Sequence, residues 1–291
     1  MNSRFVLLVI LFFNIQYMYA QKTILWKVEK EGTGKISYLL GTMHQVGNSF
    51  IDERSKIKEL LLQSKIAVFE SVEDKKTTII DVMNKRTDDF SYRDNLDKKD
   101  VQFLESAASD WTVPVRKLSP AELAVKLEQL YVLDVCETAK QTDTWKHLDD
   151  YLLSLAKIGG IKTEGLETNS DQFNAINSER DLNWKNAKEA VSARIENLRE
   201  KKNRNQLCRI SKTYLGDMNF DYQFGIKCAG NDAMVINRNK TWLPKLGTIL
   251  ESDNAFIAVG LVHLFGDCGI ISELRKQGYS VTPVPLSKDK A

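Results

Sequence analysis

Two of the three histidines in the chain end the same short motif. His44 ends the sequence GTMH at 41–44, and His263 ends GLVH at 260–263, each directly after an apolar run. With 15 glycines in 291 residues, a glycine three places before a given histidine is expected roughly one time in twenty. Two matches among three histidines therefore indicate a shared role. Imidazole binds metals and transfers protons near neutral pH, so the motif indicates metal or acid–base chemistry. The alternative is a pair of core histidines hydrogen-bonded to the backbone.

Polar residues follow other predicted elements in the same way. Glu70 ends a short apolar run, where a carboxylate is costly unless it is paired, coordinated or solvated. Beside the histidines it could bind a metal or act as a general base, whereas facing bulk solvent it would have no role. Glu167 follows a predicted strand at 161–166. Arg238 and Asn239 could hold a carboxylate or stabilise an oxyanion, although such a pair is more often a surface feature.

The elements that carry the two motifs alternate between strands and helices. The pattern predicts a hairpin of strands at 24–28 and 36–40, a helix at 53–64 and a buried strand at 66–69. At the other end it predicts a buried strand at 255–259, a helix at 267–277 and an edge strand at 279–284. Because α/β folds place their ligand crevices at the carboxyl ends of strands, both histidines are expected there. The repeated strand–GxxH–helix unit hints at internal pseudo-symmetry.

The middle of the chain is predicted to be mainly helical. Ser119 and Pro120 fit the start of a helix, and an apolar-periodic stretch at 148–158 predicts another. A long helix is expected from about 170 to 202, and one from 231 to 250 that is broken near Pro244. The predicted fold class is α/β, with a mixed central sheet flanked by helices and a mainly helical middle region.

The first twenty residues are interpreted as a secretory signal peptide. Arg4 precedes an apolar run at 5–15, and Tyr19-Ala20-Gln21 offers a small-residue cleavage point. The run is shorter than the roughly 20 apolar residues that a bilayer span needs, although a retained N-terminal anchor is the alternative. We therefore expect a single hydrolase domain at 21–291, secreted or periplasmic, with no stable membrane insertion after cleavage.

Composition and cysteine content narrow the function classes. Lys and Arg number 41 against 39 for Asp and Glu, so nucleic acid is not an expected partner. The sequence has no G-x-S-x-G, Walker, H-E-x-x-H or G-x-G-x-x-G motif. Four cysteines in an exported chain favour disulfides, with three pairings possible, while one bridge or free thiols stay open. The four are Cys136, Cys208, Cys228 and Cys268.

In combination these motifs resemble the TraB/GumN family, which includes the animal Tiki proteases. That family shows G-T-x-H after an N-terminal strand, a strand-end Glu, a middle G-L-E-T, an R-N pair and a C-terminal G-x-x-H-L. Each motif alone is weak, but their order covers nearly the whole mature chain. They appear here as 41–44, Glu70, 165–168 with Gln172, 238–239, and 260–264 with Gly266.

The resemblance implies a function and a ligand set. Tiki proteins are membrane-tethered, manganese- or cobalt-dependent proteases, and the family is similar to erythromycin esterase and ChaN-like proteins, which include an esterase and a haem binder. Unlike the Tiki proteins, this chain has no C-terminal apolar segment, so we expect no tether. The resemblance makes His44, His263 and Glu70 metal-site and catalytic candidates, and Glu167, Arg238 and Asn239 supporting residues.

The resulting hypothesis is a metal-dependent hydrolase. We expect manganese, cobalt or zinc, which the sequence does not distinguish, to activate a water that cleaves a peptide or protein substrate. Ester or other amide hydrolysis is the nearest variant, and a non-enzymatic haem- or metal-binding protein is the alternative. His147 is interpreted as an ordinary surface residue, and the oligomeric state is left open.

Overall fold

The computed structural model describes residues 21–179, 183–203, 205–228 and 233–289, so the predicted signal peptide lies outside the described residues. The described strands form a six-stranded mixed sheet in the order β5-β4-β7-β3-β2-β8 and a separate β1-β6 pair. Their bounds are β1 Gln21–Lys22, β2 Leu25–Glu29, β3 Ile36–Thr42, β4 Ile66–Phe69, β5 Lys162–Gly165, β6 Asn219–Phe220, β7 Ala255–Gly260 and β8 Ser280–Pro283.

The sheet joins a hairpin to a parallel core. β2 pairs antiparallel with both β3 and β8, which confirms the predicted N-terminal hairpin and places β8 at an edge. β3, β7, β4 and β5 are parallel to one another. β4 and β7 are buried along their whole length, as the continuous apolar runs in their sequences require. The predicted α/β class with a mixed sheet is confirmed.

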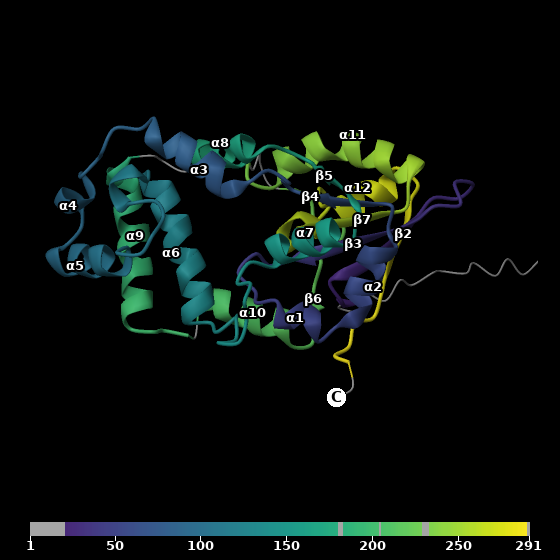
Figure 1. The fold of residues 1–291 in the computed structure, drawn as a ribbon, viewed down its shortest axis with the longest axis horizontal. Helices are drawn as coiled ribbons and strands as arrows, with labels where there is room; N and C mark the ends of the chain where they lie inside the picture. Colours follow the sequence, from purple (N-terminus) through teal and green to yellow (C-terminus); the bar gives the residue numbers. More distant parts are fainter. Residues whose placement is uncertain (1–20, 180–182, 204, 229–232, 290–291) are drawn as a thin grey trace, which may run out of the picture.

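Helices cover both faces of the sheet (Figure 1). α2 (Ser55–Gln63) and α7 (Leu148–Ile158) contact each other on one face, and α11 (Ile236–Ser252) and α12 (Ile270–Lys276) contact each other on the other, as expected if the crossovers are right-handed. Apolar side chains from all four helices share one core with the strands. Two short helices also contribute apolar side chains to this core: α1 Ser49–Asp52 and the 3₁₀ helix η2 Leu261–Leu264.

The helical middle region forms a second body with its own apolar core, built chiefly by α5, α6 and α9 (Figure 1, left). Helix α6 begins at the predicted Ser119–Pro120 cap, where Ser119 and Glu122 form a capping box. The helices of this region are α3 Lys75–Asn84, α4 Tyr92–Asn95, α5 Lys98–Ala107, the 3₁₀ helix η1 Val115–Lys117, α6 Pro120–Asp134, α8 Asn169–Glu179, α9 Trp184–Arg199 and α10 Gln206–Leu215.

Two helix predictions are wrong in detail. The single helix expected over 170–202 is two helices, α8 and α9, because Asn183 caps a new helix by accepting a hydrogen bond from the backbone of Lys185. The helix expected over 231–250 begins at Ile236 and runs through Pro244 to Ser252 without a break. Leu246 and Ile249, on the turns after the proline, are buried in the sheet core, and this packing stabilises the helix across it.

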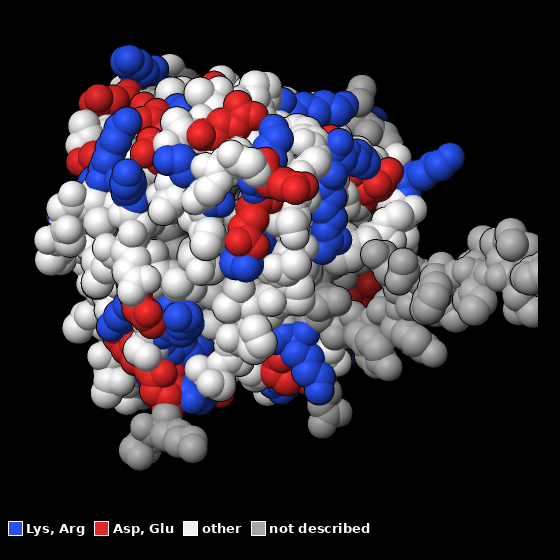
Figure 2. Space-filling model, turned by 90° about the vertical axis from the view of Figure 1, so that its right-hand side faces the viewer, with Lys and Arg blue, Asp and Glu red and all other residues white. Residues whose placement is uncertain are grey.

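All four cysteines are in disulfides, Cys136 with Cys208 and Cys228 with Cys268. The first is buried beside the helical body, and the second lies near the carboxyl end of β7. Among the described residues, no helix is both long and apolar enough to cross a membrane. On the face shown in Figure 2, basic and acidic side chains lie interspersed, so this face has no uniform charge.

Candidate functional site

The predicted site residues meet at one edge of the sheet. Thr42, which ends β3, lies opposite Gly260, which ends β7, and β4 and β5 run parallel beside them. His44, Glu70, Glu167 and His263 therefore leave four neighbouring strands at the same edge, because parallel strands end on the same side. Arg238 and Asn239 reach this edge from the first turn of α11.

Gly260 marks the point that these side chains surround. A Cβ atom on Gly260 would lie 3.1 Å from Glu70 Oε1, 3.4 Å from His263 Cδ2 and 3.6 Å from His44 Nε2. The two imidazoles, separated by more than two hundred residues in the sequence, thus face one place together with a carboxylate. The missing side chain of Gly260 leaves room for this approach.

Glu70 is buried, with only 6% of its surface exposed. Its Oε1 accepts a hydrogen bond from the backbone N–H of Gly260 at 2.8 Å, and its Oε2 accepts one from Arg238 Nη2 at 2.6 Å. Gln172, on α8, donates to the same Oε2 at 3.3 Å. Burial by itself would raise the pKa of Glu70, but the charges of the His44 and His263 imidazoles in their protonated forms, together with that of Arg238, outweigh it and lower the pKa to about 2. The carboxylate is therefore ionised throughout the physiological range.

Arg238 links the two carboxylates to one of the histidines. Its Nε and Nη2 donate to Glu167, and Nη2 also donates to Glu70. Its Nη1 lies 3.2 Å from His263 Nε2. Trp242, one turn further along α11, donates from its indole to Glu167 Oε2 at 3.0 Å and packs against the His263 ring in a tilted arrangement, with a centroid distance of 4.5 Å. The two negative charges and one positive charge are thus mutually hydrogen-bonded, as buried charges must be.

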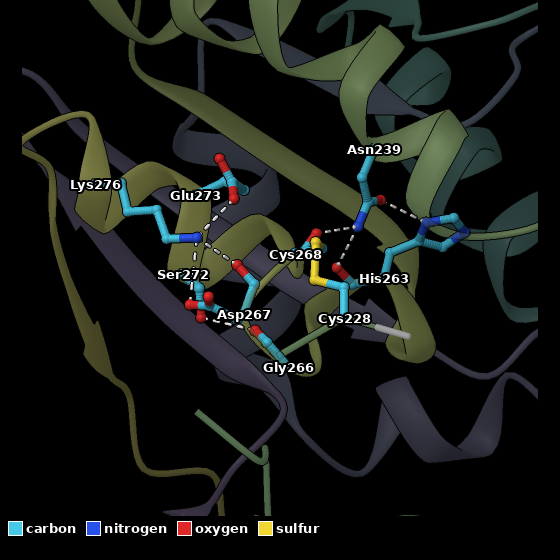
Figure 3. The surroundings of a disulfide bond; sticks show 9 residues. All are labelled: Cys228, Asn239, His263, Gly266, Asp267, Cys268, Ser272, Glu273 and Lys276. Carbon is cyan, nitrogen blue, oxygen red and sulfur yellow. Dashed lines mark hydrogen bonds and ion pairs between the residues drawn. A yellow bond between two sulfur atoms is a disulfide. The ribbon is translucent and has the colours of Figure 1, made fainter. Parts of the chain in front are cut away.

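The amide of Asn239 contacts both the ring and the backbone of His263 (Figure 3). Its Nδ2 donates to the carbonyl oxygens of His263 and Cys268 at 3.1 and 3.0 Å, so its Oδ1 must face the ring. That oxygen lies 2.7 Å from His263 Nδ1, which therefore carries the proton. Nε2 is left with its lone pair, in agreement with the Arg238 donor that faces it. Figure 3 also shows that the Cys228–Cys268 disulfide holds the loop that supplies one of these carbonyls.

The Nδ1 atom of His44 also has a hydrogen-bonding partner, which is a carboxylate. Asp149, in the first turn of α7, places Oδ2 at 2.5 Å from His44 Nδ1. Its other oxygen accepts a hydrogen bond from the Thr42 hydroxyl at 2.6 Å. The Asp149 side chain is 14% exposed, whereas 45% of the His44 side chain faces solvent. Both histidines are thus held through Nδ1, with Nε2 toward Gly260 in the case of His44.

Comparison with known proteins identifies the family of the chain. The model of the TraB/PrgY/gumN family matches residues 24–283, which is most of the chain. The chain belongs to this family. No curated protein and no solved structure shows significant similarity to it. The matched range contains every residue of the site described above.

Two residues of this TraB/PrgY/gumN member were not identified from its sequence. Asp149 lies beside Asp150 in the first turn of a helix, where acidic residues are common because they interact favourably with the helix dipole. Trp242 is an apolar-face residue of α11. Neither position stands out by spacing, because Asp149 is more than one hundred residues from its partner His44. His147 is exposed, as expected.

The residues can be compared with the needs of a divalent metal. Two imidazole nitrogens with lone pairs and one ionised carboxylate match the donor types that zinc, manganese and cobalt accept. As the side chains lie, however, no group of three His, Cys, Asp or Glu residues among those described has the spacing of a metal site. In this arrangement the guanidinium of Arg238 contacts both Glu70 and His263 Nε2. The donor set fits a metal in type and protonation, and the guanidinium supplies the positive charge in this arrangement.

Proposed function

We propose that this TraB/PrgY/gumN protein is an exported hydrolase, most simply a peptidase, whose site is the polar cluster at the carboxyl edge of β4, β7 and β3. One observation carries the proposal. Two imidazoles, each held through Nδ1 by a partner, surround one point together with a buried, ionised carboxylate. Both uses of imidazole in hydrolysis, ligation of a metal and acceptance of a proton, need the lone pair on Nε2.

Each side chain would have a distinct part. His44 is the most exposed group, with 45% of its side chain facing solvent, so it is the imidazole that substrate and water would meet first. Glu70 is held as a carboxylate by Arg238, whose charge lowers the pKa of Glu70, so it is a weak base near neutral pH, which favours a ligand or anchoring role over the general-base role. Arg238 provides fixed N–H donors and a positive charge beside the point where a carbonyl oxygen would become negative.

His44, His263 and Glu70 would hold a divalent metal, with manganese, cobalt and zinc as the candidates. When bound, the metal would polarise a carbonyl and make water more acidic. Asp149 and Asn239 keep the two rings oriented for ligation, as partners of metal-bound histidines commonly do. Glu167 keeps Arg238 in place through bonds to Nε and Nη2.

Export is supported by two features. The chain has two disulfides, and disulfides persist in oxidising compartments. The first twenty residues have the pattern of a secretory signal. Peptides and proteins outside the cytoplasm would then be the substrates, with esters as the nearest variant.

The proposal is tested with the mature chain, residues 21–291, after removal of metal by a chelator. Manganese, cobalt or zinc is added back singly, and cleavage of a fluorogenic peptide library and of nitrophenyl esters is followed. Calorimetric titration measures metal binding on the same samples. We expect metal-stimulated peptide cleavage that falls at least about 100-fold in Glu70→Gln.

The matched control is Glu164→Gln. Glu164 lies on the neighbouring strand β5, but it pairs with Lys245 away from the site, and its substitution should leave cleavage unchanged. Equal cleavage by wild type and Glu70→Gln would contradict the role of Glu70. Absence of any cleavage, together with a haemin Soret band that His44→Ala removes, would replace the hydrolase by a haem-binding protein.

A further inference from the structure

We propose that Asp149 is a positioning residue that fixes the tautomer of His44, with Thr42 fixing which oxygen of Asp149 is available. The inference goes beyond the family motifs, because Asp149 belongs to none of them, and Thr42, which lies in the GTMH motif at 41–44, has no role assigned there. It rests on the proposed function only for its effect on turnover. The arrangement itself can be tested on the protein without a substrate.

The Asp149 carboxylate lies between Thr42 and His44. Its two oxygens have different partners: Oδ1 accepts from the Thr42 hydroxyl at 2.6 Å and Oδ2 lies 2.5 Å from His44 Nδ1. Thr42 is 2% exposed and belongs to β3, so its hydroxyl is held in one place by the sheet. Asp149 starts α7, whose N-terminus favours the negative charge. Both partners of the carboxylate therefore come from fixed elements.

The Asp149 carboxylate determines which nitrogen of the His44 ring carries the proton. An ionised carboxylate can only accept hydrogen bonds, so the His44 nitrogen that faces it must carry a proton. The lone pair of the neutral ring is then confined to Nε2, the nitrogen 3.6 Å from the Cβ position of Gly260. Without this partner, no carboxylate would hold the proton on Nδ1, and either ring nitrogen could carry it.

Replacing the Asp149 carboxylate by an amide of the same shape should reverse the tautomer of His44. In Asp149→Asn, the buried Thr42 hydroxyl still needs an acceptor, and the amide oxygen is the one in reach. The amide nitrogen then faces His44 Nδ1 and donates to it, which forces the proton onto Nε2. The opposite amide orientation is disfavoured, because it would leave a buried hydroxyl proton without an acceptor. One atom replaced outside the strand-end cluster should thus move the lone pair out of the site.

The experiment reads the tautomer directly. Mature protein labelled with ¹⁵N-histidine is examined by two-bond ¹H–¹⁵N correlation spectroscopy, without added metal or substrate. His147→Gln assigns the exposed third histidine. We expect wild-type His44 to show a protonated Nδ1 and an unprotonated Nε2, and Asp149→Asn to show the reverse. Asp150→Asn, which removes the neighbouring charge in the same turn of α7, should keep the wild-type pattern.

The outcomes separate this inference from the proposed function. Peptide cleavage should fall at least about 100-fold in Asp149→Asn and stay unchanged in Asp150→Asn. A wild-type His44 with its proton on Nε2, or an Asp149→Asn spectrum that keeps the wild-type tautomer, would overturn the positioning role whatever the activity. If the tautomers invert as expected but no substrate is cleaved by wild type, the positioning role stands and the hydrolase assignment fails.

Discussion

At the scale of single residues, Arg238 is the side chain on which the other charges depend. Its guanidinium donates to Glu167 through two nitrogens and to Glu70, and it also contacts His263. Lysine in Arg238→Lys has one ammonium and cannot reach three partners in one plane. We expect a loss of cleavage of at least about 100-fold and a loss of about 3 kcal/mol in unfolding free energy, measured by urea titration. If Arg238→Lys keeps cleavage within threefold of wild type and the free energy of unfolding within about 1 kcal/mol, a positive charge alone is sufficient at this position.

Gly260 permits a test of crowding without a change of charge. Its backbone is acceptable for alanine, with φ −51° and ψ 135°, but a Cβ there would be 3.1 Å from Glu70 Oε1. In Gly260→Ala, the carboxylate and the imidazoles must shift by a few tenths of an ångström, so we expect cleavage to fall about tenfold or more while stability falls by only about 1 kcal/mol.

Gly247→Ala is the matched control for that substitution. Gly247 lies inside α11, and the nearest atom to its Cβ position is 3.9 Å away. Alanine is the better helix former by about 1 kcal/mol, so this variant should be slightly more stable and equally active. An inactive Gly247→Ala, or a fully active Gly260→Ala, would contradict the view that space at the end of β7 limits the site.

At the scale of elements, the strands were more predictable than the contacts between helices and the site. β3, β4 and β7 are short apolar runs that are followed within three residues by a histidine or a glutamate, and that pattern places His44, Glu70 and His263 at one sheet edge once the strands are parallel. Their local sequence contains both signals. The family motifs point to Arg238 as well, but not to which carboxylates it binds.

The missed features depend on tertiary packing. Asp149 acquires its role only because α7 lies beside the end of β3, and a helix-start aspartate has an ordinary local explanation. Pro244 fails to break α11 because the residues after it are buried against the sheet. The separation of α8 from α9 depends on a cap at Asn183 within a polar stretch that has helical composition throughout. Local propensity decides none of these three outcomes.

The N-terminus of α6 gives a prediction about pH. Glu122 accepts two hydrogen bonds from Arg86, one from the backbone of Ser119 and one from Asn177, and thus ties α6 to α8 and to the end of α3. Burial would raise the pKa of Glu122, but these bonds, with Arg86 first among them, lower it below its ordinary value. A lowered folded pKa means stability that is present above the unfolded pKa of about 4.3 and is lost as pH falls through the folded pKa.

We therefore expect Glu122→Gln to lower the free energy of unfolding by about 2 kcal/mol at pH 7, with the difference from wild type shrinking below about pH 4. Urea titrations at several pH values measure it. Glu128→Gln, on the same helix, removes a more exposed pair with Arg194 and should cost less than about 1 kcal/mol. A Glu122→Gln difference that is constant from pH 7 to pH 3 would assign the effect to packing instead of charge.

At the scale of the whole molecule, the chain has a sheet core and a separate helical core, and the two disulfides lie at different places in this arrangement. Cys136 and Cys208 join the end of α6 to α10, inside a small apolar cluster between the helical body and the sheet body. Cys228 and Cys268 instead hold the loop after η2, whose Cys268 carbonyl accepts a hydrogen bond from Asn239 (Figure 3).

The two bridges are matched in size of effect and differ in location, which makes them a controlled comparison. They span 72 and 40 residues, and loop-closure entropy gives each about 4 kcal/mol because the dependence on loop length is logarithmic.

Removing the Cys136–Cys208 bridge by paired serine substitution should therefore lower stability and leave cleavage per folded molecule unchanged. Removing the Cys228–Cys268 bridge should lower stability to a similar extent and also release the carbonyl that orients Asn239, so that His263 loses its fixed tautomer and cleavage falls at least about tenfold. Urea titration and cleavage assays on the two double variants measure both quantities. Equal cleavage by the two variants would mean that the loop keeps Asn239 in place without its disulfide.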